Sequence, residues 1–185
     1  MTTTRVTTLL SVLVFAAFLL GSPNPVRAAS AEDINRGVRV ALQNLYQESS
    51  SARSLAAKAK AILVFPAITK GGFLVGGQYG EGALIKDGKV IAYYNTVAVS
   101  YGLQIGIQKY GYALFFMTDA ARDYLNRSDG WELGTGPSIV VVDEGKAAGI
   151  STTTTRSDVY AFFFDQKGLM AGLGIQGTKI TRIEK

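Results

Sequence analysis

From residue 61 onwards, the chain consists of apolar stretches of strand length that are joined by short turn signals. No long amphipathic stretch separates one predicted strand from the next, as a doubly wound parallel sheet would require. Glycine is abundant, with 21 residues, and many of these lie inside the apolar stretches rather than in linkers. Such glycines indicate strands that bulge or approach one another closely. The pattern therefore predicts a curved antiparallel sheet or a partial barrel.

The turn signals and the alternation of residue types place the individual strands. Pro66 is expected to end the first strand, and Asp87-Gly88 predicts a tight hairpin of type I′. Leu103, Ile105 and Ile107 alternate with polar residues and Gly, which predicts a half-buried strand whose apolar side chains face the core. The predicted strands cover residues 62–65, 73–78, 79–85, 90–94, 103–108, 112–117, 138–142, 150–155, 159–164, 169–175 and 178–183.

Three helices are predicted around these strands. The first, Glu32–Glu48, is amphipathic, with apolar residues at helical spacing: Ile34, Val38, Ala41, Leu42 and Leu45. A second helix is expected over Ala52–Lys60, and Thr118 is expected to cap a third over Asp119–Asn126. The predicted fold class is α+β, with the N-terminal helices packed on the sheet.

The N-terminus has the features of an export signal. Arg5 precedes a mostly apolar run, Leu9–Leu20, which is short for a membrane-spanning helix and suits a signal peptide. Val26-Arg27-Ala28 and Ala29-Ser30-Ala31 both offer cleavage sites with small residues. We therefore predict a signal peptide over residues 1–28, with residue 31 as the latest cleavage position, and a domain over residues 29–185 in the periplasm or outside the cell. The alternative is an uncleaved membrane anchor.

The composition excludes several classes of function. The chain has no His and no Cys, which removes Ser-His-Asp and Cys-His catalysis and the usual zinc sites. We therefore predict that the protein is not an enzyme, with no catalytic residues, no metal ligands and no cofactor. Of 19 Lys and Arg, Arg5 and Arg27 belong to the predicted leader, and 14 Asp and Glu oppose the rest. The remaining excess of positive charge is too small to indicate a nucleic-acid partner.

Basic residues gather in the N-terminal third of the predicted domain: Arg36, Arg39, Arg53, Lys58, Lys60 and Lys70. One interpretation is an ordinary solvated helix face. The other is a surface that contacts anionic membranes, because an amphipathic helix flanked by cations can lie in the headgroup layer.

Several ordered motifs resemble the SYLF domain family. They are Lys58-Ala59-Lys60-Ala61-Ile62-Leu63-Val64-Phe65-Pro66, then Lys70-Gly71-Gly72-Phe73-Leu74-Val75-Gly76-Gly77, then Gly102-Leu103-Gln104-Ile105-Gly106, and the closing stretch from Lys167 to Thr178. Together they spread over nearly all of the predicted mature chain. The resemblance implies lipid binding, because eukaryotic SYLF proteins bind phosphoinositides and other anionic lipids, and yeast members also bundle actin at endocytic sites.

Two departures from that family change the expected partner. The chain carries a predicted export signal, and it has no SH3 or FYVE module, so the role at actin patches does not transfer. An exported bacterial-type protein would meet phosphatidylglycerol or cardiolipin rather than phosphoinositides. We therefore predict a cell-envelope domain that binds an anionic phospholipid surface through Lys58, Lys60, Lys70, Arg36, Arg39 and Arg53. The alternative is an envelope module that binds a protein partner and no lipid.

Overall fold

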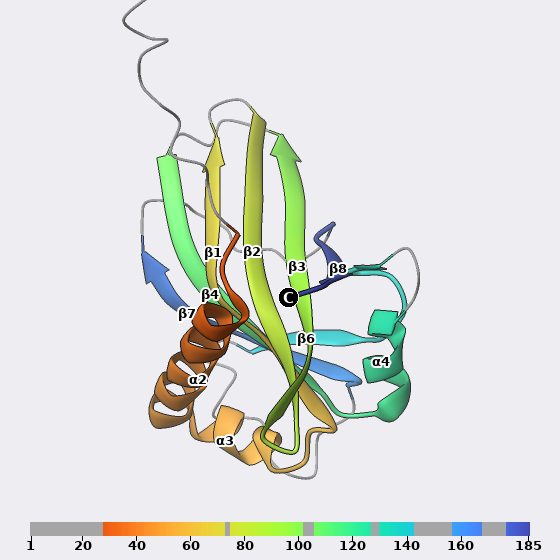
Figure 1. The fold of residues 1–185 in the computed structure, drawn as a ribbon. Helices are drawn as coiled ribbons and strands as arrows, with labels where there is room; N and C mark the ends of the chain where they lie inside the picture. Colours follow the sequence, from red (N-terminus) through yellow and green to blue (C-terminus); the bar gives the residue numbers. More distant parts are fainter. Residues whose placement is uncertain (1–27, 73–74, 102–105, 127–129, 143–156, 168–176) are drawn as a thin grey trace, which may run out of the picture.

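The computed structural model describes residues 28–72, 75–101, 106–126, 130–142, 157–167 and 177–185. Its strands form one curled sheet in the order β5-β8-β3-β2-β1-β4-β7-β6 (Figure 1). Their bounds are β1 Ala61–Gly72, β2 Val75–Lys86, β3 Lys89–Tyr101, β4 Gly106–Phe116, β5 Trp131–Glu132, β6 Ile139–Val142, β7 Val159–Lys167 and β8 Lys179–Ile183. Every neighbouring pair is antiparallel except β6 and β7, which are parallel.

Strand β1 continues through Pro66, so the prediction that this residue ends the strand is wrong. The pairing of β1 with β2 shifts register between Val64 and Ala67, and its pairing with β4 shifts between Phe65 and Ile68. Pro66 therefore lies in a bulge, where the missing N–H removes no regular ladder bond. On the helix above it, an added Cβ on Gly37 would lie 3.1 Å from the Pro66 ring. Gly37 thus lets the helix approach the sheet closely at the bulge.

The β2–β3 hairpin confirms the predicted type I′ turn. Asp87 has a φ of 50° and Gly88 a φ of 73°, and both values are positive as this turn requires. Lys86 and Lys89 pair directly on either side. The tight turn fixes the register of the two strands, which then run on for 12 and 13 residues.

Within the described residues, three α-helices accompany the sheet: α2 Ala31–Glu48, α3 Ser50–Ala56 and α4 Asp119–Asp123, which continues as a 3-10 turn, η1 Tyr124–Asn126. Ser30 caps α2 by accepting a hydrogen bond from the Asp33 amide at 3.1 Å, and Ser49 caps α3 in the same way. Thr118 caps α4, as predicted. Helix α3 is shorter than the predicted helix and ends at Ala56.

The sheet has a hydrophobic core on each side. On one side, the apolar stripe of α2 packs with α3 against β1, β2, β4 and β7, around residues such as Val38, Val64 and Phe115. On the other side, inside the curl of the sheet, α4 and η1 pack with Trp131, Tyr112 and Phe116. We call this second side the inner face. The buried aromatic residues of the strands belong to these cores.

The α+β class and the curled sheet are therefore confirmed, and α2 packs on β1 and β2. The sheet is mixed rather than wholly antiparallel, because β6 and β7 pair in parallel. Half of the predicted strand over residues 103–108, and all of those over 150–155 and 169–175, lie outside the described residues.

Candidate interaction surface

A row of five residues crosses five strands on the side of the sheet that carries α2. Register pairs join Lys109 of β4 to Thr69 of β1, Thr69 to Tyr79 of β2, Tyr79 to Val97 of β3, and Val97 to Lys179 of β8. Residues directly opposite one another share a face of the sheet. The row thus carries apolar side chains at its centre and a cation at each end.

A second row runs parallel to the first, one step further from α2. It consists of Ile107, Gly71, Gly77 and Val99, again joined by register pairs. An added Cβ on Gly71 would meet nothing closer than 3.7 Å, and one on Gly77 nothing closer than 3.9 Å. These two glycines are not required by packing. In the register, they lie between Ile107 and Val99.

The apolar side chains of these rows are exposed. Ile107 is 69% exposed, Val99 61%, Val75 58% and Tyr79 49%. Helix α2 covers the lower part of this side of the sheet, and no described element covers the part above it (Figure 1). We call this part the open sheet face, and define it by Val75, Tyr79, Val97, Val99 and Ile107, with Thr69, Gly71 and Gly77 between them and Lys109 and Lys179 at its sides.

The inner face of the same strands is polar where the open sheet face is apolar. Gln78 accepts a hydrogen bond from the Tyr110 hydroxyl at 2.7 Å and donates one to Thr178 at 3.2 Å. Gln108 is 2% exposed, and its Oε1 atom has no hydrogen-bond partner. Burial raises the pKa of Tyr110 to about 12. The upper part of the sheet therefore has inverted polarity, with apolar residues outside and polar residues inside.

This inversion corrects the prediction for the strand that contains Ile107. The alternation was expected to place Ile107 in the core and Gln108 in solvent, but Ile107 is exposed and Gln108 is buried. Alternation fixes which residues share a face and leaves open which face is buried. Here Gln108 and Gln78 both pair with Lys70 of β1, on the inner face.

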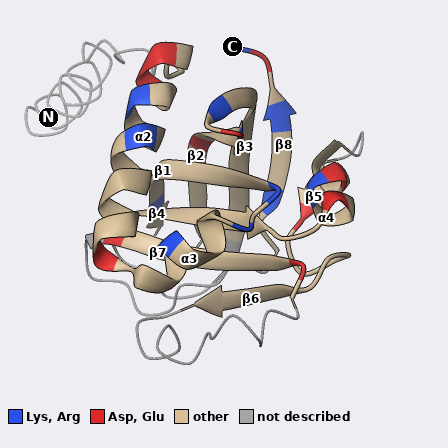
Figure 2. Ribbon diagram, turned by 90° about the horizontal axis from the view of Figure 1, so that it is seen from below, with Lys and Arg blue, Asp and Glu red and all other residues tan. Residues whose placement is uncertain are grey.

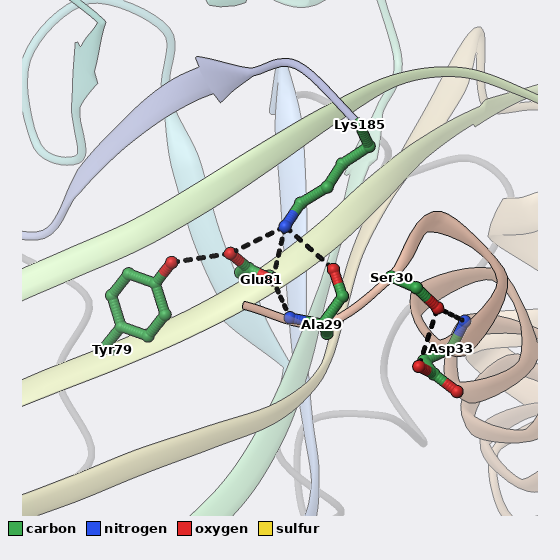
Figure 3. Close-up of polar contacts among 6 residues, drawn as sticks. All are labelled: Ala29, Ser30, Asp33, Tyr79, Glu81 and Lys185. Atoms are coloured by element: carbon green, nitrogen blue, oxygen red, sulfur yellow. Dashed lines mark hydrogen bonds and ion pairs between the residues drawn. The ribbon is translucent and has the colours of Figure 1, made fainter. Parts of the chain in front are cut away.

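A buried ion pair lies at the border between the open sheet face and α2. The Lys185 Nζ atom lies 3.0 Å from both carboxylate oxygens of Glu81, and the Tyr79 hydroxyl donates to Glu81 at 2.7 Å (Figure 3). The side chains of Glu81 and Lys185 are only 8% and 10% exposed. Burial opposes ionisation of Glu81, but the hydrogen bonds from Tyr79 and Lys185 outweigh it and lower its pKa. Burial and the Glu81 carboxylate raise the pKa of Tyr79 to about 12.

The six predicted lipid-binding residues lie in separate places. Arg36 and Arg39 are exposed on α2, where Arg36 pairs with Asp33. The Arg53 side chain donates to the Tyr46 carbonyl at the end of α2. Figure 2 shows the basic bands on α2 and near α3.

Two of the remaining three residues lie close together in sequence, and one lies far from them. Lys58 and Lys60 are exposed between α3 and β1. Lys70 is half-buried near the other end of β1, on the inner face beside Gln78 and Gln108. The structure therefore does not gather the six cations into one patch, although Arg36 and Arg39 lie on the same side of the sheet as the open sheet face.

Sequence reasoning missed Lys109 and Lys179 as site residues, because they are 70 positions apart and only the strand order brings them into one row. The sequence does contain a signal for the apolar part of the open sheet face. In β2, Val75 and Tyr79 alternate with Gly76, Gln78 and Gly80, so the bulky apolar side chains share one face and a polar or small set shares the other.

Two further features of the described residues bear on function. They contain no group of three or more Asp and Glu side chains that could hold a metal ion. None of the helices formed by these residues is long and apolar enough to cross a membrane.

Comparison with known proteins finds a family whose sequence pattern is similar to residues 97–185. Residues 97–185 match the family described as Ysc84, Las17-binding protein actin regulator, which is the SYLF domain family. This region includes Val97, Val99, Ile107, Lys109 and Lys179 of the open sheet face, whereas the motifs over residues 58–77 precede it. None of the curated proteins compared with the chain matches it. Residues 97–185 are thus similar to the Ysc84 (SYLF) family.

Proposed function

We propose that the protein is an exported, non-catalytic domain that binds the surface of anionic phospholipid membranes with its open sheet face. The observation that carries this proposal is the row from Lys109 to Lys179, in which apolar side chains are exposed between two cations. The match of residues 97–185 to the Ysc84 (SYLF) family is consistent with a binding domain of the lipid- or actin-related type.

The apolar and the cationic side chains of this row contribute to membrane binding in different ways. Exposed apolar patches mark interaction sites, and apolar side chains that enter the boundary between headgroups and acyl chains lose contact with water. Lys109 and Lys179 lie at opposite edges of the apolar area. Each cation near an anionic leaflet contributes about 1 kcal/mol. The pair therefore contributes about 2 kcal/mol, or roughly a thirtyfold change in affinity.

The exposed residues of α2 add to the same side of the molecule. Arg39 and Val40 are exposed on this helix, which packs on the side of the sheet that carries the open sheet face. We propose that Arg36 and Arg39 approach the same leaflet, and that Lys58 and Lys60 contribute less because they lie at the far end of the helical layer, beyond α3.

Co-sedimentation of the processed protein with lipid vesicles tests this proposal. We expect binding to vesicles of phosphatidylglycerol and phosphatidylcholine, and little binding to phosphatidylcholine alone. Changing Lys109 and Lys179 together to Gln, or Val99 and Ile107 together to Ser, should weaken binding at least tenfold. The matched controls are Lys58 and Lys60 to Gln, and Ile91 to Ser, because Ile91 is an exposed apolar residue outside the open sheet face.

The control variants also distinguish the alternatives. Loss of binding only in the Lys58 and Lys60 variant would move the lipid site to the N-terminal basic region. Equal binding to neutral and anionic vesicles, or no effect of any variant, would contradict the lipid proposal. In that case the open sheet face would be assigned to a protein partner.

A further inference from the structure

Ala29 lies against the buried ion pair of Glu81 and Lys185. Its backbone N–H donates to Glu81 Oε2 at 3.1 Å, and its carbonyl oxygen accepts from Lys185 Nζ at 2.9 Å (Figure 3). Ser30, the next residue, is the N-cap of α2. Both backbone polar groups of Ala29 are therefore bound by the charged side chains of Glu81 and Lys185.

The surroundings of Ala29 suit a positive charge at its nitrogen. Glu81 is an acceptor with a buried carboxylate, and its Oε2 atom faces the Ala29 nitrogen directly. Asn95 lies opposite Glu81 on the neighbouring strand, and its buried Oδ1 atom has no hydrogen-bond partner. A peptide nitrogen offers one hydrogen, whereas an ammonium group offers three and a full charge. A charged donor makes a stronger hydrogen bond to a carboxylate than a neutral N–H does.

The sequence before Ala29 offers a way to create that charge. Val26-Arg27-Ala28 places tolerated residues at the positions that an export endopeptidase reads. Hydrolysis between Ala28 and Ala29 adds the hydroxyl of water to the Ala28 carbonyl carbon and a proton to the Ala29 nitrogen. That nitrogen then takes a second proton at neutral pH and becomes an ammonium group.

We propose that the Ala28–Ala29 bond is the processing site and that Glu81 is the receptor for the ammonium group formed at Ala29. This inference rests on the export that we propose above. Cleavage after Ala31 would instead remove both Ala29 and the Ser30 cap, and with them the contacts described here. Processing thus replaces a neutral hydrogen bond by a salt bridge at the point where α2 joins the sheet.

The site also connects processing to the open sheet face. The Tyr79 hydroxyl donates to the same carboxylate, while Tyr79 itself is half exposed and belongs to that face. The Glu81 carboxylate therefore holds the new N-terminus, Lys185 and a residue of the proposed lipid-binding surface together.

The first experiment expresses the full chain in a bacterial host that exports proteins and determines the N-terminal residue of the envelope fraction by mass spectrometry. We expect Ala29. An exported form that begins at Glu32 would overturn the Ala29 site while leaving export intact. Recovery of intact Met1 would overturn export and this inference together. Neither result depends on whether the protein binds vesicles, so the lipid proposal is judged separately.

The second experiment measures how fast acetic anhydride modifies the Ala29 amine as a function of pH, with the lysines of the same molecule as internal references. A neighbouring carboxylate favours the ammonium form, so the pKa of the amine should lie above its ordinary value of about 7.7–8.0. At pH 7.5, we expect the processed protein to react at least tenfold more slowly than its Glu81→Gln variant.

The matched control is Asp33→Asn, which removes a carboxylate near the N-terminus that contacts Ser30 and Arg36 and makes no contact with Ala29. This variant should react as slowly as the unchanged protein. Circular dichroism would show that both variants are folded. Equal reaction rates for folded Glu81→Gln and the unchanged protein would overturn Glu81 as the receptor, even with Ala29 as the first residue.

Discussion

At the scale of single residues, the glycines of β2 fall into two classes according to what a side chain would meet. An added Cβ on Gly82 would lie 2.1 Å from the Val64 carbonyl oxygen, and one on Gly80 would lie 2.7 Å from Ile68. Both positions therefore allow close approach to β1 at its bulge. On the open sheet face, an added Cβ on Gly77 would meet nothing closer than 3.9 Å.

This difference predicts opposite effects of the same substitution. Gly82→Ala should lower the free energy of unfolding by about 1–3 kcal/mol, because backbone must move to admit the Cβ atom. Gly77→Ala should leave the free energy of unfolding unchanged or raise it by about 0.5–1 kcal/mol, because the unfolded chain has less conformational entropy without the glycine. Urea unfolding of both variants measures the difference. Equal destabilisation would mean that Gly77 is also required by packing.

Gly72 belongs to the first class, because its added Cβ would lie 2.3 Å from the Gly76 Cα atom. The glycines inside the apolar stretches predicted such close approaches, and Gly72 confirms this at one position, while Gly172, which lies in a similar stretch, is outside the described residues. The β-branched substitution at Gly72 remains predicted to destabilise the domain by about 1–3 kcal/mol.

At the scale of secondary-structure elements, the inner face of the upper sheet contains two glutamines in different states. Gln78 uses its side-chain oxygen and nitrogen to bind Tyr110 and Thr178, whereas the Oε1 atom of Gln108 is buried without a partner. Both residues pair with Lys70 in the register of β1. They are therefore close to matched in position and differ mainly in hydrogen bonding.

The difference predicts that Gln→Leu will act differently at the two sites. Gln78→Leu should destabilise the domain by about 1–3 kcal/mol, because it leaves buried hydroxyl groups without partners. Gln108→Leu should be neutral or stabilising, because it removes a buried acceptor whose desolvation is not compensated. Thermal unfolding of the two variants provides the comparison. A larger loss of stability for Gln108→Leu than for Gln78→Leu would show that the Gln108 side chain does have a hydrogen-bond partner when the protein is in solution.

The elements that local signals specify were predicted well. The Asp87-Gly88 turn and the apolar stripe of α2 depend on neighbouring residues, and both are found where the sequence places them. The continuation of β1 through Pro66 and the outward direction of Ile107 were predicted wrongly, because a bulge and the polarity of each sheet face depend on partner strands. The row that ends in Lys109 and Lys179 could not be predicted for the same reason, since it depends on the order of five strands.

At the scale of the whole molecule, the Glu81 cluster joins residues 29 and 185, which are 156 positions apart. Helix α2 begins immediately after Ala29, and β8 ends immediately before the segment that carries Lys185. The cluster therefore connects the start of the helical layer to one side of the sheet, through a carboxylate on a central strand. The ionisation of the Glu81 side chain therefore affects how the helical layer is held to the sheet.

The lowered pKa of Glu81 predicts how stability depends on pH. Because the folded-state pKa lies below the ordinary value of 4.5, the folded protein holds its carboxylate more strongly than the unfolded chain does. The resulting stabilisation is complete above about pH 4.5 and is lost as the pH falls through the folded-state pKa. The difference in free energy of unfolding between the unchanged protein and Glu81→Gln should therefore be largest near pH 7 and should shrink as the pH falls below about 4.5, in urea titrations at each pH. Salt at 1 M should reduce the contribution of the exposed Asp33–Arg36 pair more than that of Glu81, because the Glu81–Lys185 pair is buried. A difference that does not shrink at all as the protein is acidified would show that the cluster does not need the ionised carboxylate.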